Sequence, residues 1–140
     1  MANKLIFELV SPSALLASEE VDMVVVPGSD GDIGVLSGHA PVLSSLRPGV
    51  VDIHDDGVVT KRLFVEGGFA EITYDRCTLL AAIAKDVAEI SAEEASARLT
   101  TALERVAAAD DDNKDSAIRE ATVAEALTYA LKSGSEESSA

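Results

Sequence analysis

The stretch VPGSDGDIGVLSGHAPVLSSLRPGVVDI, residues 26–53, has the composition that decides the fold of the chain. Short runs of Val, Leu and Ile alternate there with Gly, Pro and Asp, a pattern typical of β-strands joined by tight turns. Residues 27–41 alone contain four glycines, two prolines, two aspartates and His39. Three hypotheses arise for this segment: a phosphate cradle, a catalytic loop around His39, or a shaped surface that another protein contacts.

The sequence on either side of this stretch continues the β pattern up to residue 86. The segments KLIFELV, KRLFVEGG, FAEITY and RCTLLAAIA are rich in branched and aromatic residues and are separated by turn signals such as DDG and GG. Closely spaced strands without helices between them predict an antiparallel sandwich or barrel over residues 1–86.

From residue 87 the pattern changes to that of helices. Ser91 and Glu94 have the spacing of a capping box, and Ala95, Leu99, Leu103 and Val106 recur at helical intervals after them. A second stripe, from Ile118 through Ala121, Ala124 and Leu127 to Leu131, follows the polar run DDDNKDS. We expect an antiparallel helical hairpin over residues 87–133 and a disordered polar tail over residues 134–140.

Composition and charge exclude several classes of partner. The chain has 140 residues, 47% of them hydrophobic, and a net charge of −14. Such a surface repels nucleic-acid phosphates and anionic lipids, so we expect no nucleic-acid partner and no direct lipid anchor. No apolar run approaches the roughly 20 residues that span a bilayer. The first residues read directly into a strand without the pattern of a signal or transit peptide, and the lone Cys77 suits a reducing compartment.

The phosphate-cradle hypothesis fails on spacing and charge. Gly28, Gly31 and Gly34 lie three residues apart, which matches neither nucleotide-binding glycine motif, and Asp30 and Asp32 would repel a phosphate. Catalysis by His39 with one of these aspartates as its orienting group stays open as an alternative, although no nucleophile motif accompanies it. The simpler role for the imidazole is a hydrogen bond that shapes the loop.

The sequence predicts no metal site and no cofactor. The histidines, Cys77 and the aspartates show no paired zinc-ligand spacing. DDDNKDS lacks the central glycine of a calcium loop, and Ala121 stands at its twelfth position in place of glutamate. We therefore interpret Cys77 as a core residue.

The hypothesis that remains is a contact surface. Gly31 and Gly34 bracket Asp32 and Ile33, so positive φ angles on both sides could push this pair outward. Such a turn would present one carboxylate beside one apolar side chain. A generic module whose helical hairpin binds a peptide is a further alternative.

Residues 26–53, followed by FVEGGFAEI and CTLLA, closely resemble the signature of the epsilon subunits of F-type ATP synthases, a family that includes the mitochondrial delta subunit. The resemblance covers essentially the whole chain. It implies a ten-stranded antiparallel β-sandwich followed by a two-helix hairpin, and a non-catalytic role in the central stalk that couples proton translocation to ATP synthesis. The implied partners are the gamma subunit and the c-ring, with the alpha and beta subunits as further partners of the hairpin. The implied location is peripheral, on the cytoplasmic face of a bacterial inner membrane.

The resemblance also implies which residues make these contacts. The loop that meets the c-ring in the family corresponds here to Asp30, Gly31, Asp32, Ile33 and Gly34, with Asp32 at the acidic position and His39 shaping the same surface. Ser11 lies where the family contacts gamma. An arginine on the ring could donate paired hydrogen bonds to the Asp32 carboxylate.

The chain departs from the family in its helical part. Members that bind ATP carry the motif Ile/Leu-Asp-x-x-Arg-Ala, whereas this chain has ISAEEA, with Ser91 for the aspartate and Glu94 for the arginine. From Asp86 onward there are 5 Lys and Arg against 13 Asp and Glu, a net charge of −8. We therefore expect poor ATP binding and a hairpin that inhibits ATP hydrolysis weakly or not at all.

Overall fold

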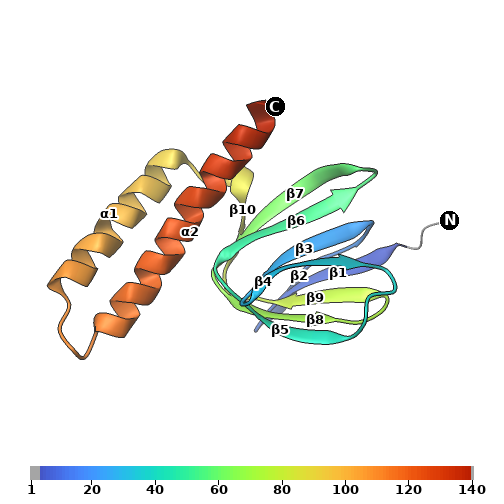
Figure 1. Ribbon diagram of the computed structural model, residues 1–140, viewed down its shortest axis with the longest axis horizontal. Coiled ribbons are helices and arrows are strands. Elements are labelled where there is room, and N and C mark those ends of the chain that lie inside the picture. The colour runs from blue at the N-terminus through green and yellow to red at the C-terminus, as the bar shows by residue number, and fades with distance from the viewer. Residues whose placement is uncertain (1–3, 140) are drawn as a thin grey trace. The chain divides into compact units, whose positions relative to one another are not determined.

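The computed structural model describes residues 4–139 and the side chains of residues 4–132. The chain divides into two compact units, with the boundary between Asp86 and Val87. The first unit contains ten strands and the second a short 3-10 helix, η1, and two α-helices, α1 and α2 (Figure 1). The strands are β1 (Leu5–Ser11), β2 (Ala14–Val21), β3 (Met23–Gly28), β4 (Gly31–Leu36), β5 (Val42–Leu46), β6 (Gly49–Asp55), β7 (Val58–Val65), β8 (Gly68–Ile72), β9 (Arg76–Leu80) and β10 (Ala84–Asp86). The helices are η1 (Val87–Glu89), α1 (Ala92–Ala108) and α2 (Lys114–Ser139).

The strands form one sheet that curls over on itself. Their hydrogen-bonded order is β10-β7-β6-β3-β5-β8-β9-β1-β2, and β4 pairs with β3 outside this path. β3 is the corner: its first half pairs with β6, whereas its last residue, Gly28, pairs with Leu46 of β5. A strand shared in this way turns one sheet into two facing layers.

The pairing is antiparallel, as predicted, except at one place. Among the described strand pairs only β1 and β9 run parallel, with Phe7 opposite Cys77 and Leu9 opposite Leu79. These strands lie at opposite ends of the β unit in the sequence, so no hairpin turn requires them to be antiparallel. The sequence pattern, which reports alternation along one strand, carried no information about this pairing.

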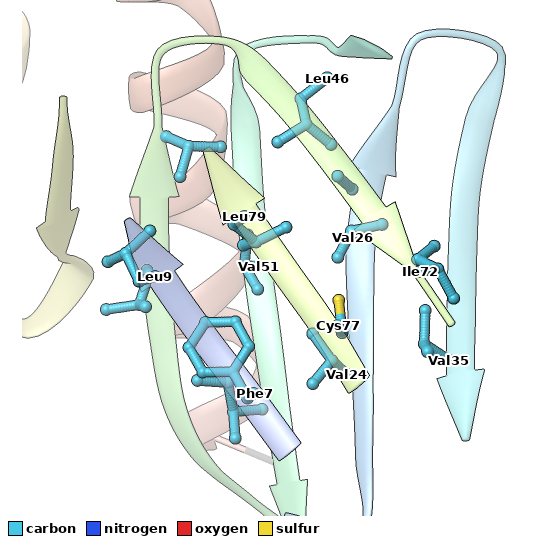
Figure 2. Packing of buried hydrophobic residues seen from close by; sticks show 14 of the residues in the cluster. Phe7, Leu9, Val24, Val26, Val35, Leu46, Val51, Ile72, Cys77 and Leu79 are labelled. Carbon is cyan, nitrogen blue, oxygen red and sulfur yellow. The ribbon is translucent and has the colours of Figure 1, made fainter. Parts of the chain in front are cut away.

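The core lies between the two layers of the curled sheet. Side chains of β1, β3, β6 and β9, among them Phe7, Val24, Val51 and Leu79, point toward one another in Figure 2 and are fully buried. Cys77 lies in the same cluster with no exposed surface, as predicted from its apolar strand. Every second residue of β1 is buried, so the alternation that predicted the strand also orients it.

The helical unit is the expected hairpin. Ser91 caps α1 by accepting a hydrogen bond from the backbone N–H of Glu94 at 3.0 Å, which confirms the predicted start. α1 and α2 lie side by side, joined by a short turn (Figure 1). The backbone of α2 continues to Ser139, beyond the end predicted at residue 133; Gly134 costs a helix about 1 kcal/mol, which does not by itself end one that is already formed.

The contact between the two helices is made by smaller residues than the sequence predicted. Ala102, Ala121 and Ala124 are buried together, and Leu99 and Val106 pack against them. Leu103 and Ile118 were expected in this contact, but they are 48% and 43% exposed. The α1 contact therefore follows Leu99, Ala102 and Val106, a spacing of three and then four residues, and Leu103 falls one position outside it.

Candidate functional site

The glycine-rich stretch forms the β3–β4 hairpin. Gly28 pairs with Gly31, and Ser29 and Asp30 form the two-residue turn between them. Gly31 has a φ of +140°, a conformation that favours glycine. A Cβ on Gly28 would lie 2.6 Å from the carbonyl oxygen of Gly31, so this position requires glycine for a different reason, the close approach of the two strands.

Asp32 and Ile33 lie in β4 and point to opposite faces of it. The Asp32 side chain is 62% exposed, whereas Ile33 is half-buried and packs against the core. Gly34 lies in the strand without a positive φ angle. The expectation that two flexible glycines push Asp32 and Ile33 outward together was therefore wrong, because consecutive strand residues alternate between faces.

Arg47, which the sequence analysis did not select, contacts this site from the connection after β5. One terminal nitrogen, Nη2, donates to Asp32 Oδ1 at 2.5 Å, and the other, Nη1, donates to the Gly28 carbonyl at 2.6 Å. The backbone N–H of Arg47 also donates to the Pro27 carbonyl at 2.9 Å. The resemblance already included this position, because Arg47 belongs to the LRPG segment of the quoted signature.

His39 lies in the loop after β4. Its Nδ1 is 2.6 Å from the Ala40 carbonyl oxygen, to which it donates, and its backbone N–H donates to Leu36 at 3.2 Å. Within residues 4–132 the imidazole has no hydrogen bond to Asp30 or Asp32. These contacts agree with the loop-shaping role, and they provide no carboxylate to orient His39 as a general base.

Ser11 ends β1 beside an exposed apolar row on the outer face of the sheet. Phe69 pairs with Leu80, Leu80 with Val10, and Val10 with Leu15, so their side chains are cross-strand neighbours on one face. Phe69, Leu80 and Leu15 are 52%, 41% and 58% exposed. A register shift in β1–β2 leaves Leu16 exposed as well, because a bulge breaks the alternation of faces.

Three carboxylates of Asp22, Asp55 and Asp56 also gather within 4.8 Å of one another. Lys4 already forms ion pairs with two of these carboxylates, with its Nζ 2.8 Å from Asp22 and 2.5 Å from Asp55. Hydrogen bonds to Asp22 and Asp55 raise the pKa of Lys4, and the bond from Lys4 lowers the pKa of Asp22. The cluster therefore includes ion pairs of the fold, which join Lys4, just before β1, to Asp22 between β2 and β3 and to Asp55 at the end of β6.

An interhelical ion pair of the hairpin lies beside a groove. Arg98 Nε donates to Glu120 at 2.7 Å, and this bond lowers the pKa of Glu120. Glu120 and Arg105 line a groove of about 300 Å³ near the turn between the helices.

None of the helices in the described part of the chain is long and apolar enough to cross a bilayer.

Comparison with known proteins identifies the family. A model described as "ATP synthase, Delta/Epsilon chain, beta-sandwich domain" matches residues 4–87. The chain belongs to this ATP synthase delta/epsilon family. The ATP synthase epsilon chain of Rhodospirillum rubrum is 51% identical over 94% of this chain and 99% of its own length, and that of Paramagnetospirillum magneticum is 52% identical over the same shares.

Solved structures agree with the delta/epsilon fold. A chain in the Euglena gracilis mitochondrial ATP synthase structure, described as OSCP/F1/c-ring, matches 94% of this chain and 83% of its own length with a TM-score of 0.83 at 22% identity. A chain in the central stalk and c-ring structure of Tetrahymena thermophila matches 93% of this chain and 98% of its own length with a TM-score of 0.68 at 16% identity. At these identities the likeness supports the two-part architecture alone.

Proposed function

We propose that this chain is a non-catalytic rotor subunit of the ATP synthase central stalk, where it joins the gamma subunit to the c-ring and transmits rotation between them. The similarity to epsilon chains over 94% of the chain supports this role. The structural observation that carries it is the rigid β3–β4 hairpin, whose Asp32 is exposed while the strand itself is anchored by Ile33 in the core. The chain would then lie on the cytoplasmic face of a bacterial inner membrane, held there by protein contacts.

The c-ring contact is assigned to the end of this hairpin. Asp30, Gly31 and Asp32 are exposed there, and Ile33 and Gly34 continue the strand behind them. His39 supports the loop at the other end of β4 through its bond to Ala40. A fixed carboxylate at the tip of a short hairpin suits an interaction that must carry torque, because little side-chain entropy remains to be lost on contact.

Charge reversal at Asp32 tests this assignment. Asp32→Arg would place a second cation beside Arg47 and oppose any cation on the ring, so we expect attachment of F1 to stripped membranes to weaken about tenfold or more. ATP hydrolysis should also become uncoupled from proton pumping. Glu19→Arg, an equal charge change at an exposed position of β2, is the matched control and should leave both unchanged. Attachment and coupling of the Asp32 variant at the level of the control would contradict the proposed ring contact.

The gamma contact is assigned to the outer-face row of Phe69, Leu80, Val10 and Leu15, with Ser11 at its edge. Adjacent apolar side chains on four neighbouring strands, of which Phe69, Leu80 and Leu15 are exposed, are typical of a protein–protein interface. Leu80→Glu should reduce the amount of gamma that copurifies with the chain, because a carboxylate would be desolvated in the contact. Val58→Glu is the matched control, since Val58 is 60% exposed at the start of β7. Equal recovery of gamma with both variants would refute the assignment.

We propose that the helical hairpin inhibits ATP hydrolysis weakly or not at all. Glu94 lies in the first turn of α1, where an ATP-binding member has an arginine, and Arg98 is already paired with Glu120. A phosphate would therefore meet an anion and one neutralised cation at this end of the hairpin. From Asp86 onward the chain carries a net charge of −8, which likewise opposes contact with any acidic surface of the catalytic subunits.

A further inference from the structure

Arg47 connects three segments at the proposed ring contact. Its backbone lies after β5, its Nη1 binds the carbonyl of Gly28 at the end of β3, and its Nη2 binds Asp32 of β4. The guanidinium is planar and its N–H groups have a fixed angular relation. The bond to Gly28, at 2.6 Å and partly buried, therefore fixes the orientation of the group that binds Asp32.

Among the described residues, the bond from Arg47 leaves Asp32 with one free carboxylate oxygen for a partner. Its Oδ1 already accepts a hydrogen bond from Arg47, whereas Oδ2 has no hydrogen-bond partner among the described residues. The expected bidentate contact, in which one partner arginine binds both oxygens of a lone carboxylate, would have to compete with Arg47 for Oδ1. Oδ2 is the oxygen that remains for a cation of the partner.

We propose that Arg47 is a positioning residue of the c-ring contact, and that the ring meets the Arg47–Asp32 pair as one unit. This inference rests on the proposed function, because it assumes that Asp32 contacts the ring. The side chains of Arg47 and Asp32 are 44% and 62% exposed, so both stay accessible while paired. Asp32 offers one oxygen to a partner cation, and Arg47 offers its remaining N–H donors to a partner carbonyl or carboxylate.

A surface that presents a carboxylate and a guanidinium side by side favours one alignment of the partner over others. A partner must present a donor and an acceptor at matching positions, and a displaced partner places like charges together. Holding the carboxylate in one orientation before contact also reduces the ordering cost of binding. Arg47 thus acts through Asp32 as well as through its own donors.

A double-mutant cycle in the full-length chain tests the inference. Arg47→Gln, Asp32→Asn and the double variant are reassembled with F1, and the Kd for c-ring-containing membranes stripped of F1 is measured. We expect Arg47→Gln to weaken attachment about fivefold, which is the upper range for an exposed ion pair. In the Asp32→Asn background the same change should weaken attachment by clearly less than fivefold, because the positioning of the Asp32 carboxylate is gone and only the contacts of Arg47's own donors remain to be lost. Arg62→Gln is the matched control, because it removes an arginine whose Nε lies 3.2 Å from Asp52 Oδ1 elsewhere in the sheet. This variant should bind the membranes as the wild type does.

The outcomes separate this inference from the proposed function. If Asp32→Asn weakens attachment and Arg47→Gln does not, Arg47 has no positioning role and the ring contact stands. If the two losses multiply in the double variant, Arg47 does not act through Asp32, and the inference that it is a positioning residue is wrong. If Asp32→Asn itself has no effect, the ring contact and this inference fail together. Arg47→Lys keeps the charge without the planar group, so it should recover less than half of the affinity that Arg47→Gln loses. If Arg47→Gln melts at a lower temperature than the wild type, Arg47→Lys replaces it in the double-mutant cycle.

Discussion

Replacement of Gly28 by alanine isolates the close approach of strands on which the β3–β4 hairpin depends. The new Cβ would lie 2.6 Å from the Gly31 carbonyl oxygen, whereas ordinary contact begins at 3.4 Å, so the two strands must separate by about 0.8 Å. β3 cannot shift freely, because Gly28 also pairs with Leu46 and accepts a bond from Arg47. The strain therefore falls on the turn itself.

We expect Gly28→Ala to lower the free energy of unfolding by about 1–3 kcal/mol, the usual cost of forcing a methyl group into a packed site. For a unit of this size that loss lowers the melting temperature by about 5–15 °C. Because Gly28 itself provides the carbonyl that Arg47 binds, strain at this residue should also disturb the Arg47 contact and weaken attachment to the c-ring in the same variant. Thermal unfolding followed by circular dichroism measures the first effect, and the membrane-binding assay measures the second.

Gly34→Ala provides the matched control six residues along the same hairpin. No atom lies within 4 Å of a Cβ built there, and the φ angle of Gly34 is not positive. Alanine should therefore be neutral or stabilise the fold by about 0.4–1 kcal/mol, since it restricts the unfolded chain. Equal melting temperatures for the Gly28 and Gly34 variants would refute the steric argument.

Three further predictions concern other parts of the molecule. The stabilisation by Lys4 and Asp22 should be present at neutral pH and be lost as the pH falls from the ordinary range of an aspartate through the lowered pKa of Asp22. Because the Lys4 pKa is raised, the alkaline loss begins only above about pH 10. The difference between the urea midpoints of the wild type and Lys4→Met should therefore be largest at pH 7 and shrink progressively as the pH falls through the acidic range, and a constant difference would contradict this linkage. Burial raises the pKa of Cys77 to about 12, so a thiol reagent should label the native chain at least about a thousand times more slowly than the unfolded chain; comparable rates would show that the thiol is accessible. Deletion of residues 87–140 should leave ATP hydrolysis by the reassembled complex unchanged, and a several-fold rise would show that the hairpin inhibits.

The helix contact shows where sequence patterns stop being informative. Hydrophobic periodicity correctly predicted both helices and the Ser91 cap, because these depend on residues within one or two turns. It favoured Leu103 over Ala102, since the larger side chain gains more from burial. The structure buries Ala102 instead, because small side chains let the two helix backbones approach closely. Which face of an Ala-rich helix is used is settled by its partner.

The Asp32–Arg47 pair shows the same limit at the candidate site. Both residues belong to the signature, 15 positions apart, and only Asp32 could be selected from it. Their contact exists because β3 lies between β4 and β5, which places the two segments on either side of the same strand end. No pattern within a few residues of the sequence indicates that these two segments are neighbours in space.

The amino-acid sequence by itself determined the class of each unit and the cap of the first helix at Ser91, because propensity and capping act over a few residues. Only the tertiary structure decided that β1 runs parallel to β9, that Phe69, Leu80, Val10 and Leu15 lie in one row on the outer face, and that Asp32 is held by Arg47. These features depend on strand order in a curled sheet. Strand order is set by how the buried faces pack against each other, and that is a property of the whole β unit.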